Sequence, residues 1–551
     1  MLGMMQQTPL LTSSLIEHAA RSHGSTEIVS RHVDDSLRRS NWKTVASRSR
    51  RIANMLQRLG VVAGDRVATL AWNRTPHLEL YFGVTGMGAV LHTVNPRLHR
   101  DQISYILGHA ESRYVFVDPD LLELAESVTA DLPGVKALIF LGTPEEMPAN
   151  SSGNLLCYEE LLRIESDVYE WPRLNENAAA TLCYTSGTTG HPKGVLYSHR
   201  STVLHAFAAV AADALALSAR DSILLATPLF HVNAWGVPFA AAMCGAKLVM
   251  PGARLDGRSL YELIRDERIT FTLGVPTLWF GLLDHVERCV DASERSSLAL
   301  QRVLCGGAAA PLALIERFQS LLGVELIQAW GMTETSPLAT VCRPLAKHEG
   351  LNPAARKQLQ SLQGRALFGI ELRLDNEAGR ALPHDGVCVG ELKVRGPWVA
   401  SGYFKHEGAV DDDGWLATGD VARIDADGFL QLTDRSKDVI KSGGEWISSI
   451  DLENAAVAHP AVAEAAVIAV AHPKWQERPL LLVRTIPGRS LDRDAMLGFL
   501  AGKVSRWWLP DDVLFVEDLP HTATGKILKS ELRKRYHDCL LKAAESGMGA
   551  P

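Results

Sequence analysis

Long apolar runs and paired cysteines are both missing from this chain of 551 residues. We find no apolar stretch of roughly 18 residues, the length of a membrane span, and residues 1–15 show no basic region followed by an apolar one. The eight cysteines are widely scattered without a C-x-x-C pair, so the spacing typical of metal and redox centres is absent. A net charge of −7 argues against a general nucleic-acid binder. We therefore expect a cytosolic protein with reduced thiols and no nucleic-acid partner.

Length and patterning predict an α/β architecture of two or more domains. A chain of 551 residues exceeds the size at which a single core stops growing. Residues 13–60 carry apolar positions at helical spacing, and strand patterns then alternate with helical ones. The expected strands are Arg66–Trp72, Ala89–Val94 and Tyr114–Val117, and the expected helices are Leu78–Met87 and Gln102–His109. This alternation favours layered α/β subdomains with parallel sheets.

The segment Tyr184–Val195 has the composition of an anion-binding loop. It reads Tyr-Thr-Ser-Gly-Thr-Thr-Gly-His-Pro-Lys-Gly-Val and follows an apolar stretch. Glycines let the backbone approach a ligand closely, while backbone N–H groups, hydroxyls and a lysine donate hydrogen bonds to phosphate oxygens. The alternative is a Gly/Ser/Thr surface turn. Because Lys193 is followed by Gly194 rather than by Ser or Thr, the Walker A pattern of P-loop enzymes is excluded.

Several later segments combine turn glycines with polar or aromatic side chains. They are Pro228–Gly236, Gly306–Ala308, Gln328–Ser336, Thr418–Asp420 and Leu519–Lys529. Taken alone, each has an ordinary structural explanation, because a histidine in an apolar run is usually a satisfied core residue and Gly-Gly or Gly-Lys is usually a turn. Their significance depends on their presence in one chain, in this order, behind the Tyr184–Val195 loop.

In this order the segments resemble the motifs of the AMP-forming adenylating enzymes, a superfamily of acyl-CoA synthetases, luciferases and peptide-synthetase adenylation domains. The resemblance implies that ATP, with Mg²⁺, activates a carboxylic acid as an acyl-adenylate, which the thiol of CoA then attacks. It also implies the fold: a large N-terminal domain of layered α/β subdomains plus a β subdomain, followed by a small mobile α+β C-terminal domain.

The same resemblance implies roles for individual residues. Catalytic roles fall on Lys526, His231, Thr188 and Glu334, and of these Thr188 and Glu334 would hold Mg²⁺. The residues implied to bind the nucleotide are Thr185, Ser186, Gly187, Thr189, Gly190, Lys193, Gly306, Gly307, Ala308, Gln328, Ala329, Trp330, Gly331, Met332, Thr333, Asp420 and Arg435. Trp330 replaces the family's commoner tyrosine, a change that keeps an aromatic stacking surface for adenine.

A domain boundary follows from the match of Asp434–Ser448 to the family's hinge motif. The N-terminal domain would span residues 1–436 and the C-terminal domain residues 437–551, with the hinge at Lys437. Rotation about this hinge would exchange the surroundings that adenylation needs for those that thioester formation needs. The residues implied on the CoA side are Lys437, Lys441, Gly443, Gly444, Glu445 and Trp446.

The acid is expected to be a medium- to long-chain fatty acid. Trp235 would gate the acyl tunnel, with Val232, Val275 and Pro276 along it; a packed aromatic without a gating role is the alternative for Trp235. The strings at 71–73, 94–97 and 197–203 resemble bacterial medium-chain fatty-acid CoA ligases and also methylthiopropanoate CoA ligases. A short thioether or branched acid such as 3-methylthiopropanoate is therefore the second candidate.

Other activities remain as alternatives. An adenylation module that loads a carrier protein is disfavoured because no appended carrier domain is visible, and a luciferase-type oxygenase is not distinguished by motif. A catalytically silent nucleotide-binding protein is the alternative from another class. The resemblance further implies a homodimer, and an apolar substrate would be compatible with transient contact with a membrane surface.

Overall fold

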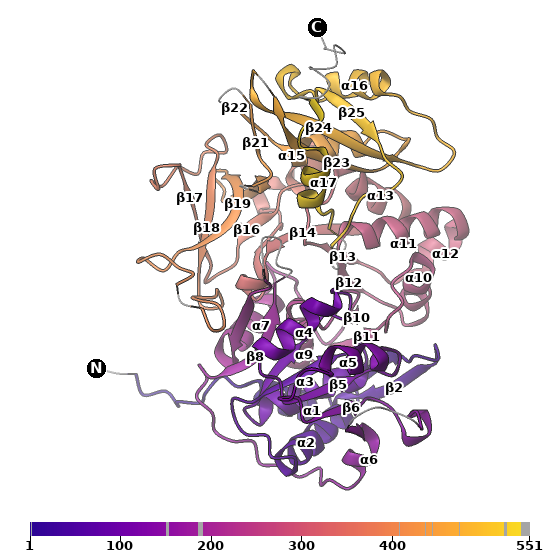
Figure 1. Cartoon of the computed structure of the whole chain (residues 1–551), viewed down its shortest axis with the longest axis vertical. Coiled ribbons are helices and arrows are strands. Elements are labelled where there is room, and N and C mark those ends of the chain that lie inside the picture. The colour runs from indigo at the N-terminus through magenta and orange to yellow at the C-terminus, as the bar shows by residue number, and fades with distance from the viewer. Residues whose placement is uncertain are drawn as a thin grey trace.

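Figure 1 shows a computed structural model of the chain, with the C-terminal elements gathered at one end of an elongated molecule. The structure describes residues 1, 3–149, 154–185, 191–406, 408–435, 437–442, 445–472, 474–522 and 526–540. Three β-sheets with covering helices make up this part of the chain. The predicted fold class, a large α/β N-terminal part followed by a small α+β C-terminal part, is confirmed.

The first complete sheet is parallel except at one edge. Its order is β7-β6-β5-β3-β4-β8-β9, and only β9 runs antiparallel to its neighbour. The strands are β3 (Arg66–Leu70), β4 (Val90–Thr93), β5 (Tyr114–Val117), β6 (Ala137–Phe140), β7 (Leu155–Cys157), β8 (Ala179–Tyr184) and β9 (Gly194–Ser198). Helices α4 (Arg100–His109), α5 (Leu122–Thr129) and α6 (Tyr158–Arg163) connect its strands. The chain between β8 and β9 holds the predicted phosphate loop, so the loop emerges from the end of a buried strand.

The second sheet changes character along its length. Its parallel part contains β1 (Glu27–Arg31), β10 (Ser222–Leu224), β11 (Lys247–Met250), β12 (Phe271–Gly274), β13 (Arg302–Cys305) and β14 (Glu325–Gly331), with β2 (Leu37–Asn41) antiparallel at the edge. Its antiparallel part contains β15 (Leu338–Val341), β16 (Gly364–Ala366), β17 (Glu371–Asp375), β18 (Gly390–Arg395), β19 (Leu416–Ile424) and β20 (Phe429–Arg435). The antiparallel part corresponds to the predicted β subdomain, and in Figure 1 β17 and β18 form its outer edge.

Two helices of the N-terminal part are buried on nearly all sides. The helix α3 (Thr75–Gly86) buries nearly every residue, as does α9 (Val237–Cys244), which is what a helix enclosed on both faces requires. By contrast, α2 (Trp42–Arg58) buries one face and exposes basic residues, and the Asn41 side chain caps it by accepting from the Thr44 N–H. The remaining α-helices of this part are α1 (Thr12–His23), α7 (His199–Val210), α8 (Val232–Trp235), α10 (Gly257–Asp266), α11 (Pro276–Cys289), α12 (Ala292–Ser297), α13 (Leu312–Leu322) and α14 (Pro353–Gln360).

The third sheet forms the C-terminal part. Its strands are β21 (Ile440–Ser442), β22 (Glu445–Ile447), β23 (Val462–His472), β24 (Gln476–Thr485) and β25 (Asp512–Phe515). The helices α15 (Ser449–Val457), α16 (Arg493–Ala501) and α17 (Lys529–Tyr536) pack on it, and separate apolar clusters lie on its two faces. This sheet therefore has its own core, and α17 follows directly on the stretch that carries Lys526.

The sequence-based expectation of helix throughout residues 13–60 is wrong. A hairpin formed by β1 and β2 separates α1 from α2. Its formation depends on pairing with β11, where Val29 lies opposite Val249 in the parallel register. Because β11 is distant in the sequence, the hairpin has no local signal of its own. The helical spacing of apolar residues in α1 and α2, on either side of it, is strong.

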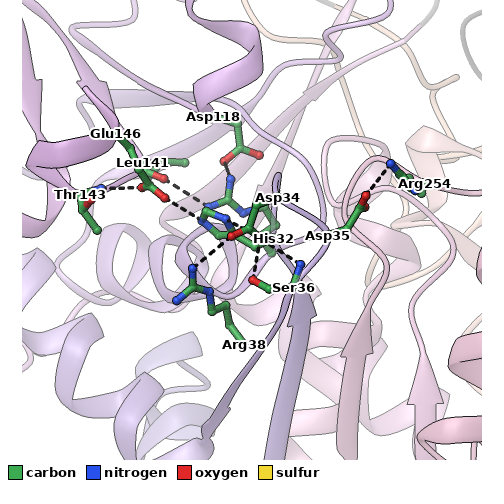
Figure 2. A network of polar contacts seen from close by, with 11 residues as sticks. His32, Asp34, Asp35, Ser36, Arg38, Asp118, Leu141, Thr143, Glu146 and Arg254 are labelled. Carbon is green, nitrogen blue, oxygen red and sulfur yellow. Dashed lines mark hydrogen bonds and ion pairs between the residues drawn. The ribbon is translucent and has the colours of Figure 1, made fainter. Parts of the chain in front are cut away.

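A buried ion pair lies near this hairpin, between the segments that follow the neighbouring strands β3 and β5 of the first sheet. Arg74 lies 2.8 Å from the carboxylate of Asp118, and both side chains are almost fully buried. Burial raises the pKa of Asp118 to about 6, and Arg74 opposes that rise. Figure 2 shows the surrounding contacts, in which His32 from the turn between β1 and β2 faces Glu146 at 3.8 Å.

Within the described residues, no helix combines the length and the apolar character that a membrane span requires.

Candidate active site

A large cavity opens where the parallel strands of the second sheet end. Its volume is about 1950 Å³. Pro228 follows β10, Val275 follows β12, Gly306 follows β13 and Trp330 lies at the end of β14, so carboxyl ends of neighbouring strands supply one wall. The C-terminal part covers the opposite side with residues such as Lys526. Ligands of open α/β sheets bind in crevices of this kind.

The cavity brings together most of the residues predicted from the sequence. Those lining it are Thr185, Lys193, His231, Val232, Trp235, Val275, Pro276, Gly306, Gly307, Ala308, Ala329, Trp330, Gly331, Met332, Thr333, Glu334, Asp420, Arg435, Lys437 and Lys526. They come from segments spread over most of the chain, and the fold converges them on one space. Their individual roles stay predictions.

The base of the predicted phosphate loop is closed by two hydrogen bonds. The N–H of Thr185 donates to the Lys193 carbonyl at 2.9 Å, and the N–H of Lys193 donates to the Thr185 hydroxyl at 3.2 Å. His191 stacks on the ring of Tyr105 from α4, with ring centroids 4.3 Å apart. The predicted loop residues Ser186, Gly187, Thr188, Thr189 and Gly190 lie outside the described residues. The flanks alone already direct Lys193 into the cavity.

Glu334 is a buried carboxylate held by a tyrosine. Its exposed fraction is 6%, and the Tyr403 hydroxyl donates to Oε1 at 2.7 Å. Lys193 Nζ lies 4.8 Å from the centroid of the same Tyr403 ring. Within the described part of the chain Glu334 makes no ion pair, so its charge has no cationic partner there. A buried carboxylate with spare oxygen lone pairs fits Mg²⁺, which prefers hard oxygen ligands and keeps sites for water and phosphate.

A second buried carboxylate, Asp420, is fixed on both oxygens. The indole N–H of Trp330 donates to Oδ2 at 2.9 Å, and Arg435 Nε lies 2.8 Å from Oδ1. Burial raises the pKa of Asp420, while Arg435 and the Trp330 hydrogen bond oppose that rise. These three predicted nucleotide-binding residues therefore form one cluster on β14, β19 and β20.

Lys526 and His231 both line the cavity. Removal from bulk water and repulsion from Arg435 lower the pKa of Lys526 to about 8, and Asp420 opposes this. Burial, with a smaller contribution from Lys526, lowers the pKa of His231 to about 4. At neutral pH the lysine is therefore mostly charged and the imidazole is neutral. The cavity is therefore lined by one cation and one neutral hydrogen-bonding ring.

The predicted acyl side of the cavity contains Trp235. A side chain placed on Gly306 would lie 3.1 Å from the indole, so the ring rests on the glycine backbone. Beside it, Gly307 has a φ of +78°, and a side chain there would meet Val275 at 3.2 Å. The Gly306–Gly307 turn, which the sequence suggested would face adenine, thus also accommodates Trp235 and Val275.

A few predicted residues lie elsewhere. The Gln328 side chain is buried and accepts from the Ala310 N–H at 2.8 Å while donating to the Gln360 carbonyl at 3.1 Å, so it braces the backbone. Lys441 lies on β21, 3.5 Å from Glu377, and is not among the cavity-lining residues. Glu445 and Trp446 belong to β22, which pairs with β21. Gly443 and Gly444 lie outside the described residues.

Sequence reasoning missed Tyr403 and Tyr105. Tyr403 links Glu334 to Lys193, and Tyr105 packs on His191 of the loop. Neither lies within a motif, and their contacts join segments far apart in the chain. Tyr105 lies in the middle of α4 and Tyr403 follows a single glycine, so neither position gave a local signal.

The cavity thus gathers a lysine from the predicted phosphate loop, two buried carboxylates and Lys526, and comparison with known proteins identifies the family. The family described as AMP-binding enzyme matches residues 16–404, and the family described as AMP-binding enzyme C-terminal domain matches residues 451–526. The chain belongs to the AMP-binding enzyme family.

Several curated relatives match over nearly their whole length. The chain is 48% identical over 547 residues to a medium-chain-fatty-acid–CoA ligase of Ectopseudomonas oleovorans, with 99% of this chain and 100% of the relative covered. It is 49% identical over 541 residues to a 3-methylmercaptopropionyl-CoA ligase of Ruegeria lacuscaerulensis, with 98% and 100% covered. It is 45% identical over 525 residues to a long-chain-fatty-acid–CoA ligase of Thermus thermophilus, with 95% and 94% covered.

Among solved structures, an anthranilate CoA ligase in complex with anthranoyl-AMP superposes with a TM-score of 0.84. The identity is 25%, and the match covers 98% of this chain and 99% of that one. Within the family, the chain is an AMP-forming acyl-CoA synthetase that uses ATP and CoA.

Proposed function

We propose that the protein is a fatty-acid CoA ligase acting on medium- to long-chain acids. It converts the acid and ATP into acyl-adenylate and pyrophosphate, and then transfers the acyl group to CoA with release of AMP. The observation that carries this proposal is the cavity, in which Trp235 and Val275 line an apolar side directly next to His231 and Lys526. An acid whose carboxylate meets the charged groups would place its hydrocarbon chain there.

Adenylation on this site would rest on positioning and charge. A carboxylate does not transfer its acyl group without activation, because the leaving group would be oxide. Lys526, charged at neutral pH, would neutralise the carboxylate and the α-phosphate as they approach, and the neutral His231 would orient the carboxylate by a hydrogen bond. Asp420 and Arg435 would hold the ribose. Glu334, with Thr188, would hold Mg²⁺, which neutralises charge on the phosphates.

Thioester formation needs a different arrangement, because Lys526 occupies the side from which CoA would come. We propose the domain boundary between residues 436 and 437, with Lys437 as the hinge for a rotation of the C-terminal domain. The change Lys437→Pro should spare adenylate formation, measured as ATP–pyrophosphate exchange, and depress thioester formation. Equal loss in both half-reactions would contradict the hinge.

A short thioether acid is the second candidate substrate. The identity of 49% to the 3-methylmercaptopropionyl-CoA ligase equals, within one percentage point, the 48% to the medium-chain ligase. Both relatives are covered end to end, so overall similarity does not separate the two acids. Trp235 would favour the shorter acid if the indole stays against Gly306 and limits the depth of the pocket.

One assay tests the proposal. AMP release by the purified protein is measured with ATP, Mg²⁺ and CoA across saturated acids from butanoic to hexadecanoic acid, with 3-methylthiopropanoate included. We expect the highest kcat/KM at a medium- or long-chain acid. A maximum at 3-methylthiopropanoate would transfer the protein to the thioether-acid ligases, and no AMP release with any acid would favour a silent nucleotide binder.

We further propose a cytoplasmic homodimer. Leu196 on the edge strand β9 and Phe207 on α7 are apolar yet exposed, at 39% and 54%, which is compatible with burial in a subunit contact. Light scattering after size-exclusion chromatography would give the mass of the assembly. Fractionation of the cells that produce it, with a membrane wash, would separate cytoplasmic protein from protein at a membrane surface.

A further inference from the structure

The segment that carries Trp235 adopts a left-handed turn. The φ angles of Val232, Asn233, Ala234 and Trp235 are 48°, 54°, 47° and 57°, and Gly236 follows at 73°. Asn233 and Ala234 have ψ angles of 42° and 45°, which completes the left-handed helical conformation. The run begins directly after His231, so the strained backbone adjoins the reacting groups.

This conformation is unfavourable for these residues. In the left-handed region the Cβ of an L-residue crowds the following carbonyl, and glycine alone is free of that cost. A β-branched residue such as Val232 is a genuine outlier there. Consecutive non-glycine residues in this region persist only where the surrounding structure holds them, and such places cluster at active sites, ligand clamps and switch regions.

Asn233 anchors the turn to the strand that leads into the phosphate loop. Its Nδ2 donates to the Thr181 hydroxyl on β8 at 2.9 Å. Its Oδ1 accepts from the Tyr81 hydroxyl at 3.3 Å and from the Cys183 thiol at 3.5 Å. The side chain is 5% exposed, so these bonds are protected from competition with water.

His205 holds the other end. A side chain on Gly236 would lie 2.6 Å from the His205 ring, so the imidazole fills the space beside that glycine. Nε2 of the same ring accepts from the Leu338 N–H at 3.1 Å, which ties the turn to β15. Burial lowers the pKa of His205 to about 4, so the ring stays neutral and keeps this acceptor at physiological pH.

The turn fixes where the indole lies. Trp235 is the last residue of the run, and its ring rests against Gly306 at the end of β13. A change of Ala234 or Trp235 to right-handed angles would swing the Cα–Cβ bond of Trp235 and carry the indole away from Gly306. The backbone conformation of the turn therefore determines the direction of the Trp235 ring.

We propose that the left-handed turn Val232–Trp235 is a strained hinge that holds the indole over the acyl side of the cavity, with Asn233 as its positioning residue. Relaxation of the turn accompanies entry of the acid, so the stored strain lowers the cost of opening. This inference rests on the proposed function, because it takes the acid to bind beside Trp235. It adds a specific consequence: the affinity for the acid depends on how much strain the closed turn carries.

Two substitutions should move the KM for the acid in opposite directions. Ala234→Gly removes strain from the closed turn without adding atoms, so relief of that strain no longer favours the open turn. The equilibrium constant for opening should fall about five- to thirty-fold, and the KM for the acid should rise by about fivefold or more. Thr181→Val removes the acceptor of Asn233 Nδ2 with little change of shape, so the closed turn weakens and the KM for the acid should fall several-fold. The KM for ATP should stay unchanged in both variants.

Arg268→Gly provides the matched control. Arg268 has a φ of 49° on the surface, so glycine relieves the same strain far from the cavity, and the KM for the acid should not change. An independent readout is the change of tryptophan fluorescence on adding the acid without ATP, corrected with Trp235→Phe. In Ala234→Gly the half-saturating acid concentration of that change should rise with the KM.

The outcomes are distinct. If the acid panel finds no substrate, the proposed function fails, and the fluorescence titration with the same acids then decides the hinge separately. An unchanged half-saturating concentration and KM in Ala234→Gly would overturn the hinge. The hinge would also be overturned if the KM for the acid and the KM for ATP both rose in Ala234→Gly and in Thr181→Val. Such a result would indicate a general disturbance of the site by either substitution.

Discussion

The indole N–H of Trp330 donates a 2.9 Å hydrogen bond to Oδ2 of Asp420, whose other oxygen lies 2.8 Å from Arg435 Nε. Asp420 is 3% exposed, so its orientation is set by these two partners rather than by water. The same tryptophan lines the cavity with its ring. At this position an indole therefore fixes the Asp420 carboxylate, which we propose binds the ribose, and its aromatic face would be available to the nucleotide.

We expect Trp330→Phe to weaken ATP binding. Phenylalanine keeps an aromatic surface but removes the donor, and a hydrogen bond to a buried charged group contributes about 1.5–3 kcal/mol. The KM for ATP in the exchange reaction should rise about ten- to hundred-fold, with the KM for the acid unchanged. Trp42→Phe is the control, because its indole donates to the Ala246 carbonyl at 3.0 Å far from the site, and it should alter stability alone. An unchanged ATP KM in Trp330→Phe would refute the positioning role.

Tyr403→Phe should raise the Mg²⁺ requirement. Its hydroxyl donates to Glu334 at 2.7 Å, and loss of that bond frees the carboxylate to rotate away from the direction in which it faces the cavity. The Mg²⁺ concentration for half-maximal AMP release should rise about tenfold, as expected for a charge-assisted hydrogen bond of about 1.5 kcal/mol. Tyr169→Phe, at a half-buried tyrosine next to Trp171, should leave the Mg²⁺ dependence unchanged. A shift of equal size in both variants would argue against a specific role of Tyr403.

The parts predictable from the sequence are those in which the signal is local. The strand Tyr114–Val117 is an apolar run of four residues and appears in the structure with the same bounds. The expected strands Arg66–Trp72 and Ala89–Val94 also appear, as β3 and β4 with slightly shorter bounds. A strand with buried apolar residues, followed by a polar turn, can be predicted from its local sequence alone.

The parts that escaped prediction depend on distant partners. The strand β2 exposes most of its residues and exists because it pairs with β1, which in turn pairs with β11. The left-handed angles of Val232 contradict the local preference of valine and depend on Thr181, Tyr81 and His205 around the turn. Gln328 sits within a nucleotide-binding motif, yet its side chain turns to Ala310 because that N–H needs an acceptor.

Arg74→Met should destabilise the fold by leaving a buried charge alone. Arg74 is 2% exposed and lies 2.8 Å from Asp118, and removal of one partner of such a pair costs about 3–5 kcal/mol. We expect a clearly lower urea midpoint, with partial recovery in Arg74→Met combined with Asp118→Asn. Arg38→Met tests the exposed rim of the same network, where the Arg38–Asp34 pair at 3.5 Å is open to solvent, and it should change the midpoint little. Equal loss in Arg74→Met and Arg38→Met would contradict the contribution of burial.

Lys526 should give the adenylation step an alkaline limit. Removal from bulk water and Arg435 lower its pKa from 10.5 to about 8, so the charged form predominates below about pH 8 and is lost as the pH rises through that value. Because the ammonium is the form that stabilises the developing negative charge, kcat/KM for ATP–pyrophosphate exchange should fall above about pH 8. Lys526→Arg keeps a cation at all accessible pH values, so its lower activity should show no such fall, whereas Lys526→Ala should lose on the order of a hundredfold or more throughout. An alkaline fall in kcat/KM that persists unchanged in Lys526→Arg would assign the titration to another group.

Thioester formation from preformed acyl-adenylate should show no such alkaline fall in the unmodified protein, because the hinge rotation would carry Lys526 away from the reacting atoms.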